Sequence, residues 1–310
     1  MSHYTVYINF GEDISHWGLV SLFNEVHEAS EGDSMQLTID FSAESLFVYA
    51  DHLLVVVIMV QHLRILGVNV KIDILGSSEY ASRVNFFHLL EIPYDERFIR
   101  QLSRGRFIEL LRFDADSMYQ LQDDLTMIIH QIGNIAIEVK QLIFYCLIEI
   151  MDNVIVHSGK EYGWLAAQVF PNRREIRLVI CDNGIGVLES LRSSEKEEFQ
   201  AIDGAAALEK CLQRGVTDGK GIGFGLYATS EFIRHNKGDL LLYSGSYCLE
   251  FSESAVVIRD GANWPGTVVA LRIRTDIPVD YKNIMPSHHT LPDDYQFFID
   301  KFFGEDNELW

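Results

Sequence analysis

Several features that define common protein classes are scarce or missing in this sequence of 310 residues. The four cysteines stand apart and form no Cys-x-x-Cys pair, which argues against a zinc site or a disulfide framework and favours reduced cytoplasmic thiols. There is no run of Lys and Arg, and the net charge is −20, so we expect no binding to nucleic acid or to an anionic membrane through bulk charge. Internal repeats and low-complexity tracts are also missing.

Long uncharged runs of apolar residues are missing as well. The most apolar stretch, 53–60, is short and is followed by His62 and Arg64, so it predicts a buried helix and no membrane span. The N-terminus lacks a basic region before an apolar one, and we expect no secretory signal. Because 48% of the residues are apolar, the chain is expected to fold as a cytoplasmic α/β protein with enough material for two cores.

The first part of the chain has the pattern of a small α/β unit. An alternating strand at 35–41, a helix at 49–66 and a second strand at 68–75 predict a parallel pair with a crossover helix. A further helix is expected at 80–90 and a strand at 107–113.

The second part begins with a long helical pattern at 117–157, with a break expected at Gly133. Strands are predicted at 163–170 and 175–181, and a helix at 224–235. The segment 187–218 is charged, then rich in alanine, and suits a mobile cover. Four further strands are predicted to close the sheet as a meander: 239–244, 249–251, 255–258 and 267–273.

Three motifs carry chemistry. Glu149 and Asn153 are four residues apart and share one face of the long helix. The segment 182–186 (DNGIG) directly follows a predicted strand, where two glycines let a flat ligand approach the backbone. The segment 219–225 (GKGIGFG) is a glycine-rich turn that opens a helix and offers N–H groups to phosphate.

Taken singly, each motif has an ordinary structural explanation. The pair Glu149 and Asn153 is typical of a solvated helix face, the sequence at 182–184 is typical of a turn, and one Gly-x-Gly-x-Gly pattern is weak evidence. The order, spacing and predicted context of the three motifs agree with one another, and this agreement favours a common site.

Together the motifs resemble the GHKL ATP-binding fold of gyrase-type topoisomerases, heat-shock chaperones, histidine kinases and mismatch-repair ATPases. The resemblance covers residues 138–274 and includes Gly266 and Thr267 as the terminal Gly-Thr element. It implies that Asn153 ligates magnesium, that Glu149 is the general base, and that Asp182 accepts a hydrogen bond from adenine. The residues that it assigns to ATP binding are Asn153, Asp182, Gly184, Gly186, Lys220, Gly221, Gly223, Phe224, Gly225, Leu226 and Thr267.

The first part resembles a STAS module, the fold of anti-anti-sigma factors. The phosphorylatable Ser or Thr of that family is missing, because the corresponding region reads Tyr49-Ala50-Asp51-His52. We therefore expect a STAS-like regulatory or docking domain at 1–115. A GHKL α/β sandwich at 116–275 is expected to have a mixed sheet with helices on one face, followed by an acidic, aromatic tail at 276–310.

Three functions remain open. The leading hypothesis is a magnesium-dependent ATPase whose cover segment closes on ATP and regulates a protein partner or a second copy of the chain. The second is a serine/threonine kinase of the anti-sigma type that acts on a separate partner, and the third is a nucleotide-sensing module without turnover. Histidine autophosphorylation is disfavoured, because His130 lacks an acidic neighbour and lies too close to the helix of Glu149.

Overall fold

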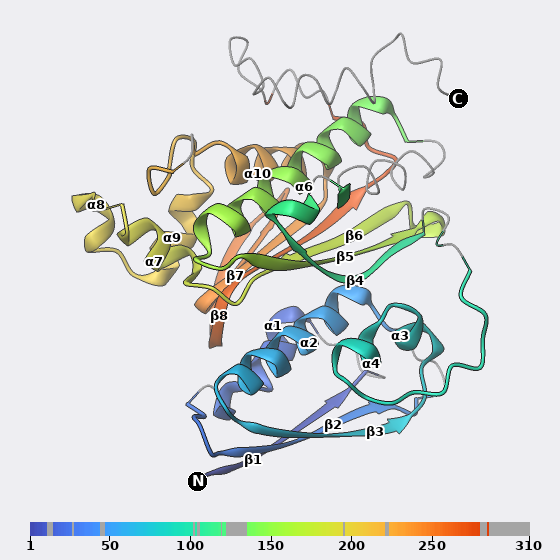
Figure 1. Ribbon diagram of the computed structural model, residues 1–310. Helices are drawn as coiled ribbons and strands as arrows, with labels where there is room; N and C mark the ends of the chain where they lie inside the picture. The colour runs from blue at the N-terminus through green and yellow to red at the C-terminus, as the bar shows by residue number, and fades with distance from the viewer. Residues whose placement is uncertain are drawn as a thin grey trace.

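The protein contains two β-sheets with helices between them and beyond the second (Figure 1). The computed structural model describes residues 1–10, 15–26, 28–43, 47–101, 103, 106–118, 120–121, 135–194, 196–220, 223–279 and 284. The predictions for Gly133 and His130 and nearly all of the tail prediction lie outside these residues.

The first sheet is parallel and has the order β1-β2-β3. Its strands are β1 (His3–Asn9), β2 (Ser34–Phe41) and β3 (Asn69–Gly76). The two predicted strands and their parallel pairing are confirmed, and β1 is a strand that the sequence analysis did not identify. Half-buried and exposed residues alternate along β3, since one face of the sheet packs on helices and the other is open.

The helices of the first part pack on one face of this sheet (Figure 1). They are α1 (His16–Ser21), the 3-10 turn η1 (Asn24–Val26), α2 (Ala50–Ile65), α3 (Glu79–Arg83) and α4 (Phe86–Leu89). The single helix predicted at 80–90 is wrong. The chain forms two short helices there because Asn85 has a φ of 69° and interrupts the helical backbone.

The second sheet has the order β4-β5-β6-β8-β7. Its strands are β4 (Phe107–Asp114), β5 (Tyr162–Phe170), β6 (Glu175–Cys181), β7 (Asp239–Ser252) and β8 (Val256–Arg274). Every neighbouring pair is antiparallel, so the expectation of a mixed sheet is wrong. The four strands predicted after 238 are two long ones, with a change of register at Gly245. Strand β4, within the range 1–115, pairs with β5.

Helices α6 (Ile137–His157) and α10 (Gly225–Asn236) cover the upper face of this sheet in Figure 1. Of the shorter helices, α7 (Gly186–Arg192) and α9 (Gly204–Cys211) contact β7, and α8 (Glu197–Gln200) lies between them in the chain. The 3-10 turn η2 (Pro171–Arg173) joins β5 to β6. The predicted helix at 224–235 is confirmed. None of the helices among the described residues is both long and apolar enough to cross a membrane.

Helix α2 lies between the two sheets and contacts β3 on one side and β5 and β6 on the other. The second sheet is thus covered on both faces, and the expectation of helices on one face is wrong. The alternation along β5 shows this division, because Trp164 and Ala166 belong to the core beside α2, whereas Leu165 and Ala167 belong to the core beneath α6 and α10.

A charged cluster lies inside this junction. Arg177 on β6 places Nε and Nη2 at 2.9 and 2.6 Å from Asp51 Oδ2 on α2. The ring of His16 on α1 lies against the same carboxylate, with Nε2 at 3.3 Å but without hydrogen-bond alignment. Arg177 also lies 3.4 Å from His52 Nε2 and stacks on the ring of Tyr49, so one guanidinium links α2 to the second sheet.

Burial and charge act in opposite directions on the two titratable groups of α2. Burial opposes ionisation of Asp51, but the neighbouring ring of His16 and the guanidinium of Arg177 hold its pKa well below the usual range. Burial, together with the charges of His16 and Arg177, lowers the pKa of His52 to about 3. His52 is therefore neutral in the folded protein at neutral pH.

We predict that this junction makes the protein sensitive to acid. Between pH 6.5 and 3 the unfolded chain binds a proton at His52 that the folded chain does not, so the free energy of unfolding falls as the pH falls. From pH 7 to pH 5 the loss due to His52 is about 2 kcal/mol. Urea unfolding at both pH values checks this.

The variant His52→Gln keeps a nitrogen donor near the same position and removes the titration. It should lose less stability between pH 7 and pH 5 than the wild type, whereas the control His88→Gln, at an exposed site on α4, should lose as much as the wild type. Equal pH dependence of the wild type and His52→Gln would contradict the prediction.

Candidate functional site

The first of the three motifs lies on the second half of α6, where Glu149 and Asn153 are both half-buried. The Glu149 carboxylate rests against Gly225, the first residue of α10, where a Cβ would overlap it. Tyr145, one turn earlier on α6, donates a hydrogen bond to Glu149. The carboxylate is thus oriented from its own helix and faces the positive end of the dipole of another.

The second motif follows β6 and is held by the part of β8 where its pairing with β6 begins. The carbonyl of Thr267 accepts from the N–H of Asp182 at 2.8 Å, and Asp182 Oδ1 accepts from the N–H of Gly184 at 2.7 Å. The indole of Trp264 donates to the carbonyl of Asp182 at 3.1 Å. Gly266 has a φ of 105° and lies so close to Asp182 that no Cβ fits there. The backbone therefore needs glycine at this contact.

Asp182 is a buried carboxylic acid with few compensating charges. Its residue is only 2% exposed, and burial raises its pKa to about 7 despite hydrogen bonds from Gly184 and Thr267 and the charge of Lys160. The next side chain, Asn183, is also buried, and its Oδ1 has no hydrogen-bond partner among the described residues. Two consecutive residues at the end of β6 thus carry buried side-chain acceptors.

A second acidic residue, Asp218, joins three segments and was missed by the sequence analysis. Its Oδ2 lies 2.7 Å from His157 Nδ1 at the end of α6 and accepts from Ser190 on α7 at 3.1 Å. Its Oδ1 accepts from the N–H of Lys220 at 3.0 Å, and the Lys220 ammonium also reaches the carbonyl of Val156 at 3.4 Å. Asp218 therefore ties the glycine-rich turn to the end of α6.

The glycine-rich turn is itself closed by backbone contacts. The N–H of Gly215 donates to the carbonyl of Gly223 at 2.8 Å, and a Cβ on Gly223 would overlap the carbonyl of Val216. Gly219 and Gly223 have φ values of 98° and 70°, conformations that favour glycine. Gly221 lies outside the described residues. Phe224 and Leu226 pack against the core beneath α6 and α10.

The motifs meet through a chain of direct contacts. Glu149 touches Gly225, and the N–H of Ile185 donates to the carbonyl of Ser158 at 2.9 Å, so the segment after β6 is fixed to the end of α6. Gly186, with a φ of 74°, begins α7 beside Ser244 of β7. The sequence-predicted residues in the described part thus lie around the ends of α6, β6 and α10.

Two places offer ligands that suit a metal ion. In the candidate site, the amide of Asn153 is a hard oxygen donor. Outside it, His16, Asp51 and His52 have their ligand atoms within 4.8 Å of one another. There the guanidinium of Arg177 already holds the carboxylate and approaches His52, and a cation would be repelled by it. We therefore treat this cluster as an ion pair within the junction.

Comparison with protein-family models, with curated proteins and with solved structures gives no match. The function of the site must therefore be argued from its own residues.

The buried acid at the end of β6 predicts that the site costs stability. The folded chain keeps its proton on Asp182 up to about pH 7, whereas the unfolded chain releases it near pH 4, so this group lowers the free energy of unfolding as the pH rises between these values. Asp182→Asn removes the titration. The free energy of unfolding of Asp182→Asn minus that of the wild type should therefore rise by about 2 to 3 kcal/mol between pH 5 and pH 8.

Chemical denaturation at the two pH values measures this difference. Asp73→Asn, at an exposed position on β3, is the matched control and should show no such change. A relative stability of Asp182→Asn that does not vary between pH 5 and pH 8 would show that Asp182 is ionised in the folded state.

Proposed function

We propose that the chain binds ATP with magnesium at the ends of α6, β6 and α10, and hydrolyses it. The observation that carries the proposal is the convergence of the three motifs, which are far apart in sequence, through the contacts of Glu149 with Gly225, of Ser158 with Ile185 and of His157 with Asp218. A helix face, a strand end and a glycine-rich turn are the parts that a nucleotide site needs.

The strand end fits the base of a nucleotide. Asp182 and Asn183 are buried acceptors, and Asn183 Oδ1 lacks a partner in the described part of the chain. A buried acceptor without a partner is costly, and a ligand with N–H donors, such as the amino group of adenine, would satisfy it. Thr267, which is hydrogen-bonded to Asp182, would support the same edge of the base.

The opposite end fits the phosphates. Helix α10 begins at Gly225, and the first N–H groups of a helix have no partner within it. Lys220 adds a positive charge in a chain whose net charge is −20, and its ammonium is half exposed near the end of α6. Asn153 would hold the magnesium ion through its amide oxygen. ATP would supply the phosphoanhydride bond, which water cleaves to ADP and phosphate, and magnesium would neutralise the negative charge of the phosphates.

Glu149 is placed to act as the general base. Its carboxylate lies at the start of α10, where the phosphates would be held, and Tyr145 orients it. A carboxylate beside the helix N-terminus can take a proton from a water molecule or a substrate hydroxyl only if it is ionised, and the helix dipole favours that form. We assign Tyr145 as a positioning residue.

The segment of α7, α8 and α9 forms the proposed cover. It has a small core of its own, built from Leu191, Phe199 and Ala207, and Asp218 connects it to α6. A change in the glycine-rich turn on nucleotide binding would therefore be transmitted to both α6 and α7. The first sheet and α2 lie on the face of the second sheet that is opposite to α6 and α10. We propose that this arrangement regulates a protein partner or a second copy of the chain.

We predict that Glu149→Gln stops hydrolysis and leaves ATP binding intact. The amide keeps the size of the side chain but cannot accept a proton, so turnover should fall at least about 100-fold. Phosphate release and calorimetric titration with ATP and magnesium measure the two effects.

The control for Glu149→Gln is Glu197→Gln, at an exposed position on α8, which should keep full turnover. Undiminished turnover in Glu149→Gln would remove the base assignment. If the wild type binds ATP without turnover, the proposal of an ATPase fails. Transfer of labelled phosphate to a partner would then identify a kinase.

We predict that Asn153→Ala loses the magnesium-dependent part of ATP binding. The variant removes the oxygen donor, so the affinity for ATP in magnesium should drop to that measured in a chelator. Asp152→Ala, an exposed neighbour on the same helix, should bind as the wild type does. Equal ATP affinity of Asn153→Ala and wild type in magnesium would refute the metal assignment.

A further inference from the structure

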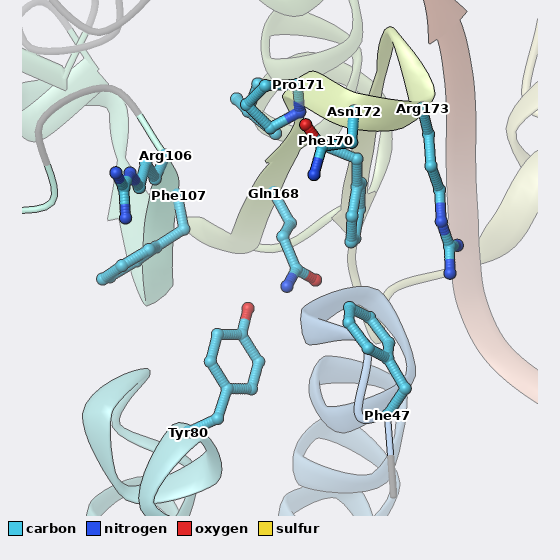
Figure 2. A pocket seen from close by; sticks show the side chains of 10 residues that line it. Phe47, Tyr80, Arg106, Phe107, Gln168, Phe170, Pro171, Asn172 and Arg173 are labelled. Atoms are coloured by element: carbon cyan, nitrogen blue, oxygen red, sulfur yellow. The ribbon is translucent and has the colours of Figure 1, made fainter. Parts of the chain in front are cut away.

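A cavity of about 370 Å³ lies away from the candidate site, at the junction between the two sheets (Figure 2). Its walls come from four parts of the chain: the segment before α2, the helix α3, the start of β4, and the end of β5 with the 3-10 turn η2. These segments are far apart in sequence, and they meet here because β4 and β5 extend past the first turn of α2.

The walls are aromatic on two sides. On one side the rings of Tyr80 and Phe107 pack edge to face, with their centroids 6.3 Å apart. On the other side Phe47 and Phe170 have centroids 5.6 Å apart. Figure 2 shows these two pairs facing each other across the opening, with Gln168 between them. A slot with aromatic walls on both sides suits a flat ring.

The polar groups at the slot favour an anion. Arg106 is exposed at the rim and has no ion pair among the described residues. Arg173 lies on the other side, over the rings of Phe47 and Phe170, and has Glu175 at 3.8 Å. None of the described residues that line the cavity is acidic, in a chain with a net charge of −20. The slot is therefore a locally positive place on an acidic protein.

One buried donor lies behind the wall of the slot. The hydroxyl of Tyr80 is buried, and it forms no hydrogen bond with the described residues. In Figure 2 this hydroxyl points toward the side chain of Gln168, whose Oε1 accepts from the N–H of Ala50 at 3.3 Å. Burial raises the pKa of Tyr80 above its ordinary value, so the hydroxyl keeps its proton. Because this oxygen has almost no accessible surface, Tyr80 contributes its ring, and not its hydroxyl, to the wall of the slot.

We infer that this cavity binds a small planar aromatic carboxylate. The ring system lies between the pairs Tyr80 with Phe107 and Phe47 with Phe170, and the carboxylate pairs with Arg106. The volume is near the lower end for ligand sites, about 300 to 1,000 Å³, and fits one or two fused rings. Such a ligand contacts residues of both sheets' layers and would stabilise their association.

The test uses the full chain without nucleotide, so its outcome does not depend on the proposed ATPase. The probe is 6-hydroxy-2-naphthoate, titrated by its own fluorescence and by calorimetry. We expect saturable binding at one site and a higher unfolding temperature in its presence. The neutral analogue 2-naphthol should bind about tenfold more weakly, because it has no carboxylate for Arg106.

Two variants assign the site. Arg106→Gln should weaken binding about tenfold, since it removes the polar contact and leaves the aromatic walls. Phe107→Leu should weaken binding about threefold, since it removes one aromatic ring from the wall. Arg259→Gln, an exposed arginine on β8 that pairs with Glu250, should bind as the wild type does. The inference is overturned if the wild type shows no saturable binding up to about 1 mM, or if Arg106→Gln and Phe107→Leu both bind as tightly as wild type.

Discussion

The middle part of helix α2 has no polar face, and the architecture follows from this constraint. Its residues from Leu53 to Val60 are all buried, so water cannot be accepted on any side of this part of the helix. A helix that is apolar all round needs a partner on every side. The first sheet supplies one partner and the second sheet the other, which is why the two sheets are layers of one structure.

The same burial explains the charges at the start of α2. Asp51 and His52 enter the junction with the helix, and a buried carboxylate without a partner would be costly. Arg177 on β6 supplies the partner, since it holds Asp51 through two nitrogens and stacks on Tyr49. The pair fixes the position of α2 against the second sheet by a directional contact, which the apolar packing around it does not provide.

Two buried aspartates of this protein have pKa values shifted in opposite directions. One belongs to the ion pair of the junction, and the other belongs to the proposed site. Asp51 faces a guanidinium, and its pKa is held low. Asp182 faces backbone N–H groups and a hydroxyl, and burial raises its pKa to about 7. A group that lowers stability at neutral pH and lies among closely packed glycines is typical of a binding site, because evolution keeps such a cost where a ligand needs it.

Local patterns of the sequence were sufficient for most strands and for the helices α2 and α10, because alternation and helical periodicity report which face of an element is buried. They also identified Glu149, Asn153 and Asp182 as candidates, since residue types and spacing carry that information. They did not identify β1 or the antiparallel order of the second sheet, which depend on pairing between distant segments. They also missed the break at Asn85, whose positive φ helical periodicity does not report. Asp218, the pair of Asp51 with Arg177 and the aromatic cavity were equally out of reach. Each of these is a contact between residues far apart in the chain, and only the packing of α2 between two sheets brings the junction residues together.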